Sequence, residues 1–152
     1  MMDQIPYDVR SYAIKELPMQ ITASAISLNV DDPTASAAFA REHFGFQEEM
    51  AADGFVSLSR PDAGFNLVYL RTGLSTFKPA SMAGKRADGL LLAFVVDDVD
   101  REYERLIAEK VEITTPIETE EWGERYFQVT DPCGVVIQLV QWVAAPPETV
   151  TA

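Results

Sequence analysis

Side chains able to carry out nucleophilic or acid–base chemistry are scarce in this sequence. Its 152 residues contain one histidine, His43, and one cysteine, Cys133. His43 follows Phe39 by four residues on a predicted helix, which favours packing or a place at the helix C-terminus over a role as general base. Cys133 lies in an Asp-Pro-Cys-Gly turn without a basic neighbour, which favours an inert thiol. We therefore predict no catalytic residue, no His- or Cys-rich metal site and no internal disulfide.

Aromatic and charged side chains near residue 120 are better candidates for contact with a ligand. Trp122 and Arg125 precede a predicted hairpin, where an indole and a guanidinium could stack on a conjugated molecule. The alternative is structural: Trp122 would cover a sheet edge, and Arg125 would pair with Glu124 or Glu121. The acidic residues around them would either attract a cationic ligand or form a solvated face; they are Glu118, Glu120, Glu121 and Glu124.

The composition excludes several classes of protein. The chain has 12 Lys and Arg against 24 Asp and Glu, and its formal charge of −12 argues against binding to nucleic acid. The longest apolar run, residues 90–96, is too short to cross a membrane. The first residues show neither the basic flank nor the apolar stretch of a signal peptide. With a single cysteine, these features indicate a cytoplasmic protein.

The first half of the chain predicts one strand, one helix and three further strands. Residues 25–30 alternate between apolar and small or polar side chains, the period of a strand with one buried face. Asp32 and Pro33 suit the start of a helix, and Gly45 suits its end. The expected elements are a strand at 25–30, a helix at 33–44, strands at 46–50, 55–59 and 65–71, and a loop at 72–89.

The second half repeats this order. Val30-Asp31-Asp32 and Val96-Asp97-Asp98, 66 residues apart, each close a predicted strand and open a predicted helix. We therefore predict an α+β fold of two βαβββ units. The expected elements of the second unit are a strand at 90–96, a helix at 99–110, and strands at 111–115, 125–130 and 135–142.

Three stretches carry motifs whose order and spacing are informative. They are residues 32–46, ending in Phe44-Gly45-Phe46, residues 122–125 (Trp-Gly-Glu-Arg) and residues 131–134 (Asp-Pro-Cys-Gly). Together they resemble the first helix and last hairpin of the vicinal oxygen chelate superfamily, which includes glyoxalase I, bleomycin-resistance proteins, fosfomycin-resistance enzymes and extradiol dioxygenases. The resemblance spans residues 21–143. It implies an open, cup-shaped mixed sheet with helices on the convex side and a ligand on the concave side.

Enzymes of this family hold a divalent cation in the cup through ligands on the first and fourth strands of each unit. The resemblance assigns these four positions to Ala25, Tyr69, Leu91 and Gln138. Alanine and leucine cannot bind a metal, and glutamine is a weak neutral ligand. We therefore expect no metal and no cofactor, as in the metal-free, bleomycin-resistance-like branch.

Alternation along four strands predicts which side chains line the cup. Most are small or apolar, and the few polar ones suit the orientation of a flat organic ligand. The predicted lining is Ala25, Ser27, Asn29, Leu67, Tyr69, Arg71, Leu91, Ala93, Val95, Val136, Gln138 and Val140. Among lining and flanking residues, we expect ligand contacts from Asn29, Leu67, Tyr69, Leu91, Trp122, Arg125 and Gln138.

The resulting prediction is metal-independent binding of a small apolar or aromatic molecule, such as an antibiotic or metabolite, for sequestration or carriage. The alternative is a metal-dependent, glyoxalase-like lyase or dioxygenase that uses ligands such as Glu48, Glu49 or Asp53, or an enzyme with Tyr69 as a general acid. A third possibility is a regulatory or structural dimer with a vestigial cup.

The predicted domain organisation is an N-terminal arm at 1–20, a domain at 21–145 and a tail at 146–152. Unit one would span 21–78 and unit two 88–145. Two short units expose strand edges that pairing would cover, and members of the family often dimerise, so we expect a homodimer.

Overall fold

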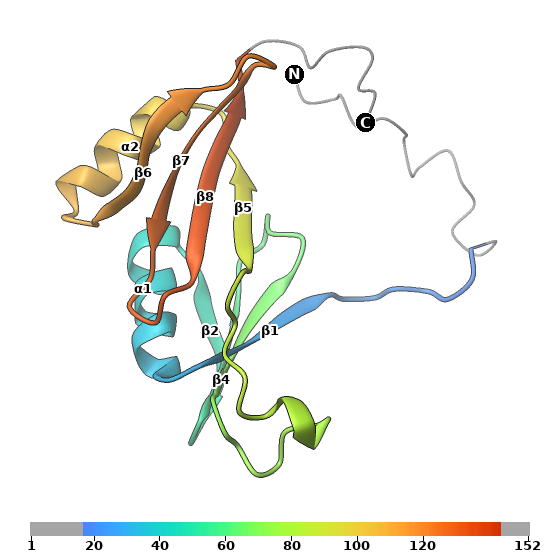
Figure 1. The fold of residues 1–152 in the computed structure, drawn as a ribbon. Helices are drawn as coiled ribbons and strands as arrows, with labels where there is room; N and C mark the ends of the chain where they lie inside the picture. The colour runs from blue at the N-terminus through green and yellow to red at the C-terminus, as the bar shows by residue number, and fades with distance from the viewer. Residues whose placement is uncertain (1–16, 144–152) are drawn as a thin grey trace.

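The computed structural model describes residues 17–143, and it confirms the duplicated α+β architecture (Figure 1). Each unit forms a four-stranded sheet with one helix packed on it. The predicted arm therefore falls mostly, and the tail wholly, outside the described residues. Unit one contains β1 (Ala25–Val30), α1 (Pro33–Phe44), β2 (Gln47–Ala52), β3 (Phe55–Ser59) and β4 (Asn66–Arg71). Unit two contains β5 (Leu91–Val95), α2 (Val99–Ala108), β6 (Ile113–Thr119), β7 (Glu124–Thr130) and β8 (Val136–Trp142).

The two helices begin through the same local device. The Asp32 carboxylate accepts a hydrogen bond from the backbone N–H of Ala35, and the Asp98 carboxylate accepts one from Arg101, both at 3.1 Å. Each satisfies one of the N–H groups that a first helical turn leaves without a partner. α1 ends at Gly45, whose φ of 69° is the left-handed conformation that glycine adopts without strain.

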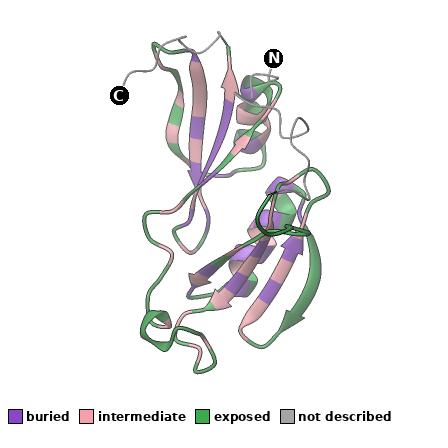
Figure 2. Cartoon of the chain, turned by 90° about the vertical axis from the view of Figure 1, so that its right-hand side faces the viewer, coloured by how far each residue is buried: buried purple, intermediate pink, exposed green. Residues whose placement is uncertain are grey.

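The strand order is the same in both sheets: β1-β4-β3-β2 and β5-β8-β7-β6. The first strand of each unit pairs in parallel with the fourth, and the remaining pairs are antiparallel. One face of each sheet is covered by its own helix, and we call the other the open face. Figure 2 shows buried positions alternating with exposed or half-buried ones along the strands, as a sheet covered on one face requires.

The core lies between each sheet and its helix. Its fully buried members include Leu28, Leu58 and Tyr69 in unit one and Leu106 and Phe127 in unit two. The two units meet where the C-terminal end of α1 reaches β5 and α2. There the Phe94 ring lies 6.4 Å from Phe44 and 6.0 Å from Phe46, measured between ring centroids.

Most strand boundaries differ from the sequence prediction by one or two residues, and the differences in β6 and α2 have identifiable causes. β6 continues to Thr119, four residues past its predicted end, although Pro116 lies within it. Proline is tolerated there because β6 is an edge strand whose pairing with β7 is irregular around this residue. α2 ends at Ala108 rather than at residue 110, and Lys110 adopts a φ of 68°.

The predicted loop at 72–89 is confirmed as the connection between the units, with a short 3-10 helix, η4 (Ala80–Met82), inside it. It is held against the first sheet. The amide nitrogen of Asn29 donates to the backbone oxygens of Met82 and Lys85, and the N–H of Ala87 donates to the Asn29 oxygen. The connection therefore occupies the free edge of β1 at this end.

Candidate functional site

The open face of unit two is the best candidate for a binding surface. β5 places Leu91, Ala93 and Val95 on it, and β8 places Val136, Gln138 and Val140 opposite them in register. The predicted orientation of these six residues is confirmed. Leu91, the first residue of β5, is 46% exposed, and Val95, its last residue, is 57% exposed. Gln138 and Val140 are buried, at 8% and 4% exposure, so the exposed apolar part of this face within residues 17–143 is on β5.

One polar group is built into this apolar surface with a defined orientation. The oxygen of Gln138 accepts a hydrogen bond of 2.9 Å from the amide nitrogen of Gln128, whose own oxygen accepts one of 2.7 Å from the Thr115 hydroxyl. This chain of bonds, Thr115 to Gln128 to Gln138, fixes which end of each amide faces which neighbour. The Nε2 group of Gln138 is left as a donor without an acceptor among residues 17–143.

The open face of unit one is less available. Ala25, Ser27 and Asn29 lie on it as predicted. The amide nitrogen of Asn29, however, is used to hold the connecting loop, so only its oxygen is left for a ligand.

The predicted orientation of β4 is wrong. β1 and β4 pair in parallel with Leu28 beside Tyr69, so Leu67, Tyr69 and Arg71 share the helix-covered side with Leu28. Leu67 and Tyr69 are 2% and 1% exposed, and burial together with Asp131 and Cys133 raises the pKa of the Tyr69 phenol. Five consecutive positions of β4, 66–70, show no clear apolar–polar alternation, so the sequence favoured neither face. Val68 and Leu70 occupy the open face instead.

Arg125 also lies on the helix-covered side, against the expectation of a ligand contact. Its guanidinium makes two hydrogen bonds to the Asp100 carboxylate on α2, at 2.7 and 3.1 Å, and a third to the Thr119 hydroxyl. The guanidinium lowers the pKa of Asp100. The structural alternative for Arg125 is therefore the better description, although its partner is Asp100 rather than Glu121 or Glu124.

Trp122 lies in the turn between β6 and β7 and is 47% exposed. Its indole N–H donates to the Glu124 carboxylate at 3.2 Å. The neighbouring Tyr126 was missed by the sequence analysis. It shares the open face with Val140, and its hydroxyl donates to Glu120 at 2.5 Å. That bond, with the nearby carboxylates of Glu118, Glu120 and Glu124, raises the pKa of Tyr126 to about 12.

Alternation along β7 was the signal that could have found Tyr126, because Phe127 and Val129 are apolar whereas Gln128 and Thr130 are polar. Trp142, at the end of β8, shares the open face by the same register. The open face of unit two therefore ends in aromatic side chains surrounded by carboxylates.

The donor set does not fit the metal centre that the resemblance implies. Within the two sheets, Gln138 pairs with Ala93 as Val68 pairs with Ser27, so the four positions become Ala25, Val68, Leu91 and Gln138. Three are hydrocarbon, and the Gln138 oxygen is already bonded to Gln128. Across residues 17–143, no group of three or more His, Cys, Asp or Glu side chains is placed to hold a metal ion.

The alternative ligands on and beside β2 are engaged separately. Glu48 lies 3.6 Å from Arg41, Glu49 accepts from the Ser59 hydroxyl, and Asp53 pairs with Arg71 at 3.2 Å. Arg71 lowers the pKa of Asp53. Among residues 17–143 these carboxylates do not form a group of three that could hold a metal ion.

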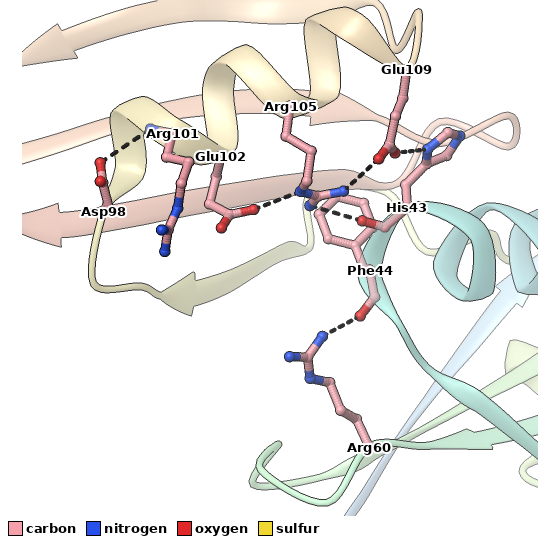
Figure 3. Close-up of polar contacts among 8 residues, drawn as sticks. All are labelled: His43, Phe44, Arg60, Asp98, Arg101, Glu102, Arg105 and Glu109. Atoms are coloured by element: carbon pink, nitrogen blue, oxygen red, sulfur yellow. Dashed lines mark hydrogen bonds and ion pairs between the residues drawn. The ribbon is translucent and has the colours of Figure 1, made fainter.

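His43 and Cys133 have structural surroundings. His43 is near the C-terminal end of α1, where its ring lies 4.9 Å from that of Phe39 and its Nδ1 lies 2.8 Å from the Glu109 carboxylate (Figure 3). This contact joins the two units and, together with Arg105, lowers the pKa of Glu109. The Cys133 thiol donates to the backbone oxygen of Asp32 at 3.4 Å. Neither residue lies on the open face of unit two.

Similarity to known proteins agrees with the architecture. A structure described as a glyoxalase/bleomycin resistance protein/dioxygenase from Nocardioides shares 22% identity, with a TM-score of 0.72 over 89% of this chain and 93% of that one. Lactoylglutathione lyase from Agrobacterium tumefaciens shares 21% identity, with a TM-score of 0.63 over 82% of this chain and 94% of that one. TioX from Micromonospora sp. ML1 shares 21% identity, with a TM-score of 0.63 over 80% of this chain and 99% of that one.

No curated protein matches the chain at a significant level. None of the helices in the described part of the chain is long and apolar enough to cross a membrane. Residues 22–139 match the Glyoxalase/Bleomycin resistance protein/Dioxygenase superfamily. The sequence match and the paired βαβββ units together show that the chain belongs to this superfamily.

Proposed function

We propose that the chain binds a small, largely apolar or aromatic molecule on the open face of unit two, without a metal, for sequestration or carriage. The ligand would be an antibiotic or a metabolite, and the protein would bind it in the cytoplasm. One observation carries the proposal: an oriented amide donor, Gln138 Nε2, lies at a largely buried position beside the exposed side chains of β5. Binding sites for small molecules combine apolar walls with a few fixed polar groups in this way.

The affinity would come mainly from apolar burial. Covering Leu91 and Val95 removes hydrocarbon from water, a gain of ~25 cal/mol per Å². Gln138 would donate to an oxygen of the ligand, and Trp122 and Tyr126 would contact its far end. Asn29, from the other unit, is left as a possible acceptor contact through its amide oxygen.

The proposal includes a homodimer in which a second copy completes the binding surface. β5 is an edge strand whose Leu91 and Val95 are exposed, and β1 is an edge strand that the connecting loop covers at one end only. Unpaired edges beside apolar side chains favour association with another chain. Sedimentation equilibrium tests this part by itself: a dimer is expected for the wild type, and a monomer at all concentrations would remove the second copy from the account.

Substitution of Leu91 tests the location of the site. N-Phenyl-1-naphthylamine, an uncharged aromatic dye that has no carbonyl oxygen, is the probe, and its fluorescence on binding is the readout. Leu91→Arg should weaken binding by about tenfold or more, because it removes apolar contact and places a charge against the ligand. Ile107→Arg on the outer side of α2 is the matched control, since Ile107 is 50% exposed. Equal affinities for the two variants would show that the dye binds elsewhere.

A further inference from the structure

A cavity of about 660 Å³ lies between the two units, beside the end of α1 and α2. Unit one contributes the end of α1 and the turn between β3 and β4, and unit two contributes β5 and α2. We call it the seam cavity; its walls include Phe44, Phe65, Phe94, Arg60 and Arg105. Its volume is in the range of 300–1,000 Å³ typical of sites for small molecules. Ala93 and Val95 from the open face of β5 also line it, whereas Leu91 and Gln138 do not.

Aromatic rings from both units form the apolar part of the seam cavity. The ring of Phe94 from β5 lies within about 6.5 Å of Phe44, Phe46 and Phe65 from unit one, with centroid distances of 6.4, 6.0 and 6.0 Å. Phe65 is nearly parallel to Phe94, at an interplanar angle of 25°. These flat walls suit a flat apolar molecule.

Two arginines supply the polar part, one from each unit (Figure 3). Arg60 donates to the backbone oxygen of Phe44 at 2.6 Å, and Arg105 donates to that of His43 at 3.0 Å. Both carbonyls belong to the last turn of α1, where the helix provides no further backbone N–H to donate to them. The arginines therefore fix the end of α1, and that role holds their guanidiniums in place at the cavity.

Each guanidinium has N–H groups that no residue in the described part of the chain accepts from. Arg60 uses three N–H groups, on Phe44 and Asp62, and Arg105 uses three, on His43, Glu102 and Glu109. A guanidinium has five N–H groups, so two on each arginine have no acceptor in the described part of the chain. A ligand that enters the cavity meets donors for which it can supply an oxygen.

The charges around the cavity favour a neutral oxygen on the ligand over an anionic one. The positive charge of Arg60 is balanced by Asp62, and that of Arg105 by Glu102 and Glu109. Glu42 adds a further carboxylate to the lining. An anionic ligand would therefore gain little attraction, whereas a neutral carbonyl oxygen accepts hydrogen bonds without meeting this negative charge.

We propose that the seam cavity is a second binding site, for an uncharged, flat and mainly apolar molecule that carries a carbonyl oxygen. The rings around Phe94 hold the apolar body, and Arg60 and Arg105 donate to the oxygen. Because the walls come from both units, an occupant stabilises their contact and raises the unfolding temperature.

Three naphthalenes of similar shape test the chemistry on the wild-type protein. Naphthyl methyl ketone should bind about tenfold more tightly than ethylnaphthalene, which lacks the acceptor, and more tightly than naphthoate, which adds a charge. The Nη–Hη resonances of Arg60 and Arg105, which carry the donors without an acceptor, should shift on addition of the ketone. Equal affinity for all three compounds, or preference for naphthoate, would overturn the proposed ligand class, and absence of shifts at both arginines would overturn the site.

A matched pair of glycine substitutions tests the location. A Cβ at Gly64, which lines the cavity, or at Gly84, in the connecting loop, would meet no atom within 4 Å, and neither glycine has a positive φ. Gly64→Leu should fill part of the cavity and abolish ketone binding, and Gly84→Leu should leave it unchanged. Ketone binding retained by Gly64→Leu would contradict the proposal. Leu91→Arg should retain ketone binding, so failure of either site is distinguishable from failure of the other.

Discussion

The two units share one strand order but pack their helices with different side chains. The capping residues Asp32 and Asp98 are 66 positions apart, and the same offset relates Ala37 to Tyr103 and Ala40 to Leu106. α1 thus places small residues against its sheet where α2 places large ones. α1 also reaches unit two through Phe44, whereas α2 contributes Arg105 and Glu109 to the same junction. The repeat therefore preserves the architecture and the caps, and leaves the packing free to differ.

The open faces differ as well. In unit one the connecting loop bonds to Asn29, whereas in unit two Leu91 and Val95 are exposed around Gln138. The open face of unit one thus helps to hold the connecting loop, whereas the exposed part of the open face of unit two holds no other segment of residues 17–143. This asymmetry locates the proposed function in unit two.

The largest expected effects on the free energy of unfolding come from giving each helix the side chain that the other has at the equivalent position. Leu106→Ala should lower the free energy of unfolding by about 2–5 kcal/mol, because Leu106 is fully buried and its loss leaves a cavity. Ala40→Leu, the reverse change at the equivalent position, should cost about 1–3 kcal/mol through overpacking. Urea denaturation measures both. If Ala40→Leu stabilised the protein, the two interfaces would not be packed as described.

Removing the caps should have smaller and similar effects. Asp32→Ala and Asp98→Ala each delete one hydrogen bond of 3.1 Å to the first turn, at a cost of about 1 kcal/mol. The same denaturation experiment gives the values, with Asp32→Asn and Asp98→Asn as variants that keep a capping oxygen. A difference of more than about 2 kcal/mol between the two alanine variants would show that the caps are not equivalent.

The smallest expected effect is a change in a tyrosine pKa. It distinguishes Tyr69, buried in unit one, from Tyr126 on the open face of unit two. The pKa is raised at both residues, by burial at Tyr69 and by the Glu120 hydrogen bond at Tyr126. Folding thus favours the neutral phenol, and the stabilisation from Tyr126 is complete below pH ~10 and lost as the pH rises through about 12. Glu120→Gln should lower the pKa of Tyr126 and leave that of Tyr69 unchanged, as measured by NMR titration of the two rings. An unchanged Tyr126 pKa would remove Glu120 as the main cause.

Local signals in the sequence predicted the repeat, the caps and the orientation of β1, β5 and β8. Asp-Pro and Gly45 act within one helical turn, and strict alternation in 25–30 specifies a buried face without reference to the rest of the chain. β4 was assigned the wrong face because apolar residues occur on both of its sides, and only its register with β1 decides the orientation.

The candidate site was harder to predict for the same reason. Arg125 and Tyr126 are neighbours on opposite faces of β7. Because the sequence around them is rich in carboxylates, it did not show which carboxylate each would bond to. The bond from Gln128 to Gln138 joins two strands, and the seam cavity joins two units. Such features depend on tertiary pairing that no local pattern encodes.

Metal dependence of ligand binding tests the central claim most directly. N-Phenyl-1-naphthylamine is titrated into protein whose content of Ni, Zn, Fe and Mn has been measured, before and after dialysis against a chelator. The account predicts saturable binding with the same dissociation constant in both samples, at a metal content far below one per chain. Stoichiometric metal in the first sample, together with loss of binding after its removal, would contradict it.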